Sequence, residues 1–534
     1  MSKSALAEKS KADELLEGLD DNQREAVCSL SGPVRILAGA GAGKTRTITR
    51  RIAYAVKTGN WDPQKTLAVT FSVKAAGEMR KRLSALGLED KTQINVATFH
   101  SAALRQLRMV WRDVAESPFP HVVEDAHRLA FSAAKTVTCK DDYSHMEVRD
   151  ILAEINRTKV SLINPDSYAY VCERTKRVPP AGLEPDTMSQ IIKNYEMSKT
   201  ALNQIDFDDI LLIVCHIIRE FPQCAEKICK NIAYLSVDEY QDVSPLQHRL
   251  MRMWLGLKEE KAKPKKSDMP SVCVVGDPGQ TIYSFAGATS WYLLDFVNEF
   301  APISADLRLD RDYRSTPQVI NYANKILKSS PLNEDYLSLV TVRENGKRIS
   351  RTVYKNDFEE AASVSAKIKN LLRSGVSADD IAVLMRINAQ ARPVAAEFRK
   401  AQIPFQIRKN PAFDSAGYMF DADDFKLFGS GDSKENNDVN SAAARSSDTK
   451  FSSGRVTISS IHAAKGLEWK HVFLIGCSEG LIPYGFIRDA QTLEEERRLL
   501  YVGVTRAEDA LNLSYAQAKN IDGAANRRPS RFLT

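Results

Sequence analysis

Short apolar runs alternate along this chain with longer segments of helix-forming residues. The runs are VRILA (34–38), KTLAVTF (65–71), INVATF (94–99), AYLSVDE (233–239), SVCVVGD (271–277), IAVLMR (381–386), VTISSI (456–461) and HVFLIG (471–476). Buried strands that alternate with helices are typical of parallel sheets covered by helices. The pattern therefore predicts an α/β protein with parallel sheets in both halves of the chain.

Three segments interrupt this alternation. Residues 107–199 have a mostly helical pattern, as expected for an insertion within the first α/β unit. The lysine-rich segment KEEKAKPKKSD (258–268) is typical of a solvated surface loop. Residues 429–454 contain one Val and one Phe among polar and small residues, so they cannot bury a core, and we expect a flexible linker there.

Composition narrows the class of protein without identifying it. A chain of 534 residues should form three or four domains, and 43% hydrophobic with 27% charged residues is ordinary for a globular protein. The net charge of +6 permits nucleic-acid binding but is weak evidence for it. The N-terminal residues lack an apolar signal segment, and the longest apolar run, ILLIVCHII (210–218), is about half a membrane span. We therefore expect a cytoplasmic protein.

The segment LAGAGAGKT (37–45) predicts a phosphate-binding loop. Its glycines tolerate positive φ, so successive backbone N–H groups can turn toward one point at the positive end of the helix that follows. Lys44 would reach the β- and γ-phosphates, and the Thr45 hydroxyl would bind Mg²⁺. A flexible turn is the alternative, but the strand, glycines, Lys-Thr pair and helix occur in the required order. The predicted ATP contacts of the loop are Gly39, Ala40, Gly41, Ala42, Gly43, Lys44, Thr45 and Arg46.

Two further strand ends carry polar residues suited to ATP hydrolysis. Asp238 and Glu239 end one strand, where Asp238 could hold Mg²⁺ and Glu239 could orient and deprotonate the attacking water. Gln280 follows another strand and could sense the γ-phosphate. Tyr283 and Phe285 lie just beyond it and could stack on bases, although a single aromatic residue more often belongs to a core.

Nine segments in this order resemble the motifs of superfamily 1 DNA helicases of the UvrD/Rep/PcrA group. They are LDDNQREAV (19–27), AGAGAGKT (38–45), TFSVKAAGEMRKRL (70–83), VATFHSAALR (96–105), VDEYQD (237–242), GDPGQTIYSFAGA (276–288), LDRDYRSTPQVI (309–320), SSIHAAKGLEWKHVFL (459–474) and LLYVGVTRA (499–507). The segment GDPGQTIYSFAGA is similar to the second UvrD-like branch of actinobacteria. The resemblance spans nearly the whole chain and implies an ATP- and Mg²⁺-dependent 3′-to-5′ DNA helicase with two RecA-like domains.

The resemblance also implies a role for further residues. Gln23 would read the adenine edge, Tyr313 would stack on the base, and Glu468 would contact the ribose. Arg314 and Arg506 would reach the γ-phosphate from the second domain. The matching positions for single-stranded DNA are Phe71, Lys74, Phe99, His100, Tyr283, Phe285 and His462. The implied partners are single-stranded DNA, 3′-tailed duplex DNA and repair proteins, with the chain a monomer in isolation.

Together these features predict four regions. Residues 1–106 and 196–296 form the first RecA-like core, 107–195 a helical insertion, 297–411 and 455–534 the second core, and 412–454 a reduced accessory region or linker. Two departures from the family stand out: Ala286 replaces a common Arg, and the large accessory domain is reduced to about 45 residues. A nucleotide-switched DNA-binding module without productive unwinding is the alternative function, but Glu239 and Arg506 together favour turnover.

Overall fold

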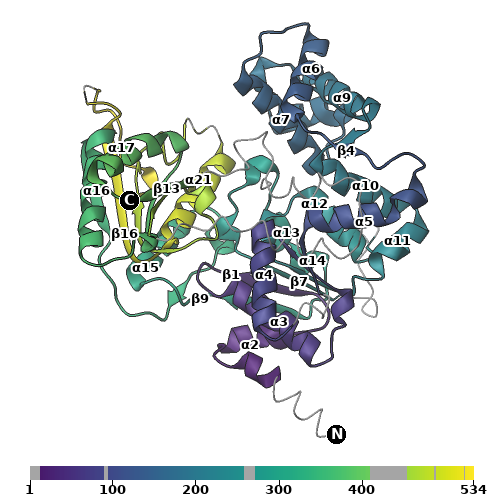
Figure 1. Cartoon of the computed structure of the whole chain (residues 1–534), viewed down its shortest axis with the longest axis horizontal. Coiled ribbons are helices and arrows are strands. Elements are labelled where there is room, and N and C mark those ends of the chain that lie inside the picture. Colours follow the sequence, from purple (N-terminus) through teal and green to yellow (C-terminus); the bar gives the residue numbers. More distant parts are fainter. Residues whose placement is uncertain are drawn as a thin grey trace.

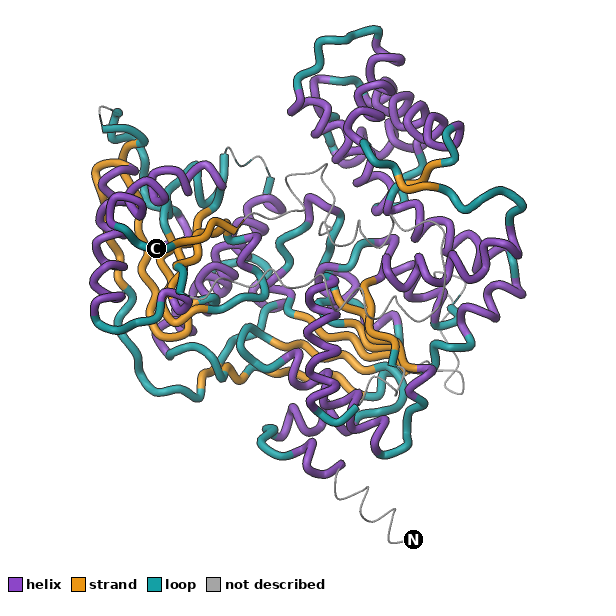
Figure 2. The backbone as a smooth tube through the Cα atoms, viewed as in Figure 1, coloured by secondary structure: helices purple, strands orange, loops and turns teal. Residues whose placement is uncertain are grey.

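The computed structural model describes residues 12–88, 94–257, 271–408 and 454–533, except residues 486, 488 and 522. The lysine-rich segment and nearly all of the predicted linker lie outside the described residues. Two sheets separated along the horizontal axis dominate the fold, and a helical body projects from one of them (Figures 1 and 2). Within the described ranges, no helix combines the length and apolar character needed to cross a membrane.

The first sheet has six parallel strands. In spatial order they are β3 (Asn95–Thr98), β2 (Thr66–Thr70), β6 (Tyr234–Val237), β7 (Ser271–Gly276), β1 (Val34–Ala38) and β8 (Ala305–Leu309). Five of the six match runs predicted from the sequence. Helices α2 (Asp21–Cys28), α3 (Lys44–Lys57) and α4 (Val73–Ala85) belong to one face, and α5 (Phe99–Val114), α10 (Phe207–Glu220), α11 (Pro222–Cys229) and α12 (Pro245–Trp254) to the other.

A helical body interrupts this first α/β unit (Figure 1). It consists of α6 (Ala126–Thr138), α7 (His145–Val160), α8 (Tyr168–Thr175) and α9 (Pro185–Ala201), with a short ribbon of β4 (His121–Val122) and β5 (Gln204–Ile205) at its base. Short helices α13 (Trp291–Leu294) and α14 (Phe296–Glu299) then lead into β8.

The second sheet is also six-stranded and parallel. Its order is β11 (Ser350–Asn356), β16 (Ala507–Ala518), β15 (Trp469–Leu474), β12 (Ile381–Met385), β14 (Val456–Ser460) and β13 (Phe405–Arg408). Helices α16 (Asp357–Arg373) and α17 (Ala391–Ala401) cover one face, while α15 (Pro317–Lys328) and α21 (Ala490–Val504) pack together on the other. A two-stranded ribbon, β9 (Arg311–Asp312) with β10 (Val340–Thr341), lies between the sheets.

The first sheet extends beyond the boundary predicted at residue 296, because β8 pairs along its whole length with β1. The sequence ADLRL of β8 mixes charged and apolar residues, and its side chains alternate between exposed and buried positions. In strand β11, SRTVYKN, at the edge of the second sheet, exposed positions alternate with partly buried ones, and only Tyr354 is buried. Edge strands bury only one face, so neither has the continuous apolar run by which the inner strands are recognised.

Candidate functional site

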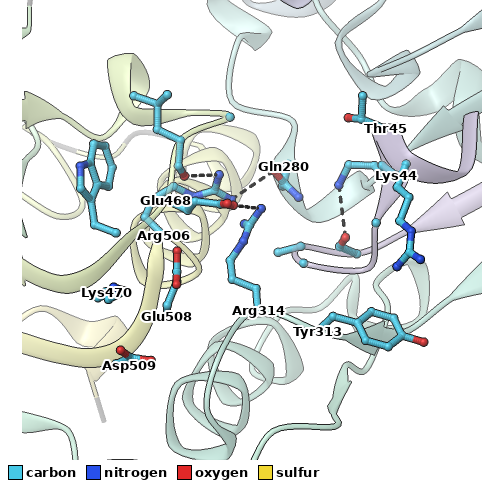
Figure 3. Close-up of a pocket in the computed structure, with 18 of the residues that line it drawn as sticks. Lys44, Thr45, Gln280, Tyr313, Arg314, Glu468, Lys470, Arg506, Glu508 and Asp509 are labelled. Carbon is cyan, nitrogen blue, oxygen red and sulfur yellow. Dashed lines mark hydrogen bonds and ion pairs between the residues drawn. The ribbon is translucent and has the colours of Figure 1, made fainter. Parts of the chain in front are cut away.

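The glycine-rich loop joins the end of β1 to the start of α3. Gly41 and Gly43 have φ values of +68° and +78°, and a Cβ atom on Gly41 would lie 2.0 Å from Oδ2 of Asp312. Glycine is therefore required by both conformation and space at position 41. The Lys44 ammonium donates to the carbonyl oxygens of Ala38 at 3.0 Å and Gly39 at 3.3 Å (Figure 3).

Gln23 and Tyr313 contact this loop from outside. The Gln23 amide donates to the carbonyl of Ala42 at 3.0 Å, and its side chain is buried. The backbone N–H of Tyr313 donates to the carbonyl of Gly41 at 3.1 Å, and its hydroxyl donates to the Asp20 carboxylate. Gln23 and Tyr313, the two residues predicted to contact the adenine of ATP, thus lie beside the loop, although only Tyr313 lines the cleft described next.

A cleft of about 1040 Å³ lies between the two sheets and gathers predicted site residues from distant parts of the chain. Those that line it are Gly39, Ala40, Gly41, Gly43, Lys44, Thr45, Arg46, Glu239, Gln280, Tyr313, Arg314, Glu468 and Arg506. Figure 3 shows Lys44 and Thr45 on one side and Glu468 and Arg506 on the other, with Arg314 between them. Ala42 and Asp238 are buried and do not line this cleft, and Asp238 lines a second, small cavity with Glu239. The arrangement brings both arginines to the cleft that holds the glycine-rich loop.

The two arginines of the cleft are held differently. Arg314 forms an ion pair with Glu468, whereas Arg506 is only 2% exposed and donates to the carbonyl of Leu467 at 3.1 Å (Figure 3). Burial and the neighbouring charge of Arg314 lower the pKa of Arg506 to about 10. Two cationic groups that line one cleft favour an anionic ligand.

Asp238 and Glu239 lie at the carboxyl end of β6 and differ in environment. Burial and the adjacent Glu239 carboxylate raise the pKa of Asp238 to about 7. Burial acts in the same direction on Glu239, but Lys44, Lys465, the hydrogen bond from Gln241 and the charge of Arg506 together hold the pKa of Glu239 below its ordinary value. Glu239 is therefore the carboxylate that stays ionised and faces the cleft.

Four of the predicted DNA-contacting residues form one aromatic cluster. Phe71 stacks on Tyr283 with ring centroids 5.3 Å apart, and Phe285 lies 6.1 Å from both Tyr283 and His462. His462 and Tyr283 are buried, whereas Phe285 is 48% exposed. Burial, with Arg386 and Lys465, lowers the pKa of His462 to about 3, so this imidazole is neutral at physiological pH. Phe285 is consequently the most exposed ring of the cluster.

Of the remaining predicted DNA contacts, two are buried and one is exposed. Phe99 is buried and stacks on Trp254 at 5.7 Å, and buried His100 lies 3.7 Å from the Asp208 carboxylate. With Phe71, these two residues line a small cavity of about 30 Å³ beside Glu239. Lys74 is exposed in the first turn of α4.

Several residues of the cleft are missing from the sequence predictions. They are Arg82, Arg343, Asp379, Gln406, Thr457, Gly466, Leu467, Trp469, Lys470, Glu508 and Asp509. Lys465, whose ammonium pairs with Asp242 and donates to the carbonyl of Gln280 at 2.7 Å, also bridges the two halves of the chain. It lies within the recognised segment SSIHAAKGLEWKHVFL, so the motif could have identified it as a candidate site residue. Arg343 lies outside the recognised segments, and only the folded structure brings it to Asp509.

Comparisons with known proteins agree with this geometry. The UvrD/REP helicase N-terminal domain model matches residues 19–301, and the UvrD-like helicase C-terminal domain model matches residues 307–415 and 432–518. The chain is 36% identical to ATP-dependent DNA helicase UvrD2 of Mycobacterium tuberculosis (strain ATCC 25618 / H37Rv), over 98% of this chain and 82% of that protein. It is 26% identical to ATP-dependent DNA helicase PcrA of Bacillus subtilis (strain 168), over 98% of this chain and 86% of that protein. These matches confirm the resemblance found in the sequence.

Proposed function

The chain belongs to the UvrD/REP helicase family and is an ATP-dependent DNA helicase, and we propose that it moves 3′-to-5′ along single-stranded DNA in repair or replication-associated genome maintenance. One observation supports the part of the proposal that concerns ATP: the glycine-rich loop of the first sheet and two arginines from later in the chain line a single cleft. In the proposed domain division, each sheet with its helices is a RecA-like core, and α6 to α9 are an insertion. ATP bound between two such cores can couple hydrolysis to their relative movement.

In this proposal the loop from Gly39 to Arg46 binds the ATP phosphates through its N–H groups, the Lys44 ammonium and the N-terminal end of α3. Lys44 would exchange its two carbonyl partners for phosphate oxygens. Tyr313 would stack on the adenine, and Gln23 would read its edge from beside Ala42.

The residues at the phosphate end also fit Mg²⁺. The Thr45 hydroxyl and the Asp238 carboxylate supply the oxygen ligands that this ion prefers. The raised pKa of Asp238 supports the assignment, because burial beside a second carboxylate costs free energy that a bound cation would offset. When bound, Mg²⁺ would neutralise charge on the phosphate oxygens.

Hydrolysis would then use groups from both cores. Glu239, ionised and facing the cleft, would orient the attacking water and accept its proton, while Gln280 would sense the γ-phosphate. Arg314 and Arg506 would stabilise the charge that develops on the transferred phosphoryl group. The Arg314–Glu468 ion pair would have to open, which would release Arg314 for the phosphate and Glu468 for the ribose.

Single-stranded DNA would contact the aromatic cluster described above. Phe285 is the member with the largest exposed fraction, and a base stacked on an aromatic ring contributes about 1 to 3 kcal/mol. We expect Phe285→Ala to weaken single-stranded DNA binding by about 5- to 150-fold, with little change in ATP affinity without DNA. Fluorescence anisotropy with a labelled oligonucleotide measures the effect. Phe358→Ala, which removes an equally exposed ring at the start of α16, should bind DNA like the parent.

The direction of movement and the occurrence of unwinding are tested together. ATPase rates are measured with and without single-stranded DNA, and strand separation is then measured on 3′-tailed and 5′-tailed duplexes. We expect DNA-stimulated hydrolysis and unwinding of the 3′-tailed duplex by a monomeric chain. Preference for the 5′-tailed duplex would contradict the proposed polarity. DNA binding that responds to ATP without steady hydrolysis would instead support the nucleotide-switched binding module.

A further inference from the structure

Gln241 follows the proposed general base by two residues, and its side chain is fully buried. Its amide nitrogen donates to Oε2 of Glu239 and, at 3.2 Å, to Oδ2 of Asp242. Its amide oxygen accepts the backbone N–H of Asp277 at 3.0 Å. Because the amide oxygen accepts from Asp277, the amide nitrogen is the end that faces the Glu239 carboxylate.

The backbone around Gln241 is shaped to allow these contacts. Glu239 has φ of +54°, a left-handed conformation that is uncommon for residues other than glycine. This turn at Glu239 precedes the short helix η6 (Tyr240–Asp242), which carries Gln241. Across from it, a Cβ atom on Gly276 would lie 2.5 Å from the Gln241 amide oxygen. The glycine at the end of β7 thus leaves the space that the amide occupies.

Polar contacts continue from Gln241 to the second half of the chain. Asp277 donates its backbone N–H to Gln241, and its carboxylate accepts a hydrogen bond from the Gln280 side-chain amide at 2.7 Å. The Gln280 amide oxygen in turn lies 3.5 Å from a guanidinium nitrogen of Arg506. The last contact is the longest and crosses between the sheets, so a change in their relative position would alter it first.

We propose that Gln241 is a positioning residue for ATP hydrolysis, which orients the Glu239 carboxylate and links it through Asp277 and Gln280 to Arg506. The inference rests on the proposed role of Glu239 as the base. A carboxylate with one oxygen held by a buried amide has fewer orientations, and the other oxygen is left for the attacking water.

Two apolar substitutions remove the contacts of Gln241. Gln241→Met and Gln241→Leu both remove the donor to Glu239 and the acceptor for the Asp277 N–H, and neither adds a charge beside Glu239 and Asp242. We expect each variant to lower kcat of DNA-stimulated ATP hydrolysis by about 10- to 100-fold, with KM for ATP within about twofold. Gln318→Met is the matched control, because both ends of the Gln318 amide are also hydrogen-bonded but it lies outside the cleft. Near-parental kcat in both Gln241→Met and Gln241→Leu would overturn the proposal, since the amide would then not be needed for hydrolysis.

A double variant tests whether Gln241 acts through Glu239. In a Glu239→Gln background, Gln241→Met should lower kcat by less than about twofold further, because the carboxylate that it orients is already gone. Multiplicative losses in the double variant would overturn the inference and leave the role of Glu239 intact. Parental kcat in Glu239→Gln alone would instead contradict the proposed function. Melting temperature and ATP affinity are measured for every variant, and Gln241→Leu keeps the test available if Gln241→Met does not fold.

Discussion

Glu239→Gln is expected to lower kcat of DNA-stimulated ATP hydrolysis by about 10²- to 10⁴-fold while ATP still binds. The substitution keeps the size of the side chain but removes the carboxylate that would accept the proton of the attacking water. The low pKa of Glu239, set by Lys44 and Lys465 against the effect of burial, keeps this group ionised in the parent protein. Steady-state ATPase and equilibrium binding of a fluorescent ATP analogue measure the two quantities separately.

Glu360→Gln provides a matched control for this variant. Glu360 is also a buried carboxylate, but its partners are the Ser514 hydroxyl and the backbone N–H of Gly476, away from the cleft. We expect its kcat to stay within about twofold of the parent value, because it has no role in the reaction. If Glu239→Gln hydrolyses ATP as fast as Glu360→Gln at saturating DNA, another group must be the base.

The sequence predicts those parts of the structure in which a short run of residues has to satisfy a local physical requirement. Inner strands of a parallel sheet are buried on both faces, so their apolar runs are continuous, as in VRILA and IAVLMR. The glycine-rich loop is recognisable because positive φ and the close approach of Asp312 leave no room for a side chain at Gly41. The resemblance to the helicase family then implies that Arg314 and Arg506 approach the loop, and the cleft contains both arginines and the loop.

Local patterns do not predict whether an individual motif residue is buried or which residue it contacts. Phe99 and Phe285 both belong to recognised segments, yet Phe99 packs on Trp254 and Phe285 is exposed. The difference arises from tertiary packing, since Trp254 lies on α12, far from Phe99 in the sequence. The contact of Gln241 with Asp277 likewise depends on the pairing of β6 with β7. Such contacts require the register of the sheet and the path of each loop.

Arg506→Ala is expected to reduce kcat by about 10³- to 10⁵-fold, the range associated with an arginine that stabilises phosphoryl transfer. The guanidinium is buried between the carbonyls of Val502 and Leu467 and the Gln280 amide oxygen, so its position is fixed before ATP binds. Arg506→Lys keeps a positive charge but cannot make these divergent contacts, and we expect it to recover only a small part of the rate. Single-turnover hydrolysis measures the chemical step, and ATP affinity should change much less than kcat.

The prediction for Arg506 requires a control for folding, because removing a buried guanidinium leaves the carbonyls of Val502 and Leu467 without this donor. Arg527→Ala removes a partly buried arginine, which pairs with Asp357 outside the cleft. We expect this control to lose some thermal stability and to hydrolyse ATP at nearly the parent rate. If Arg506→Ala melts as Arg527→Ala does and also keeps the parent kcat, then Arg506 contributes to packing between the two sheets and Arg314 alone must stabilise the transferred phosphoryl group.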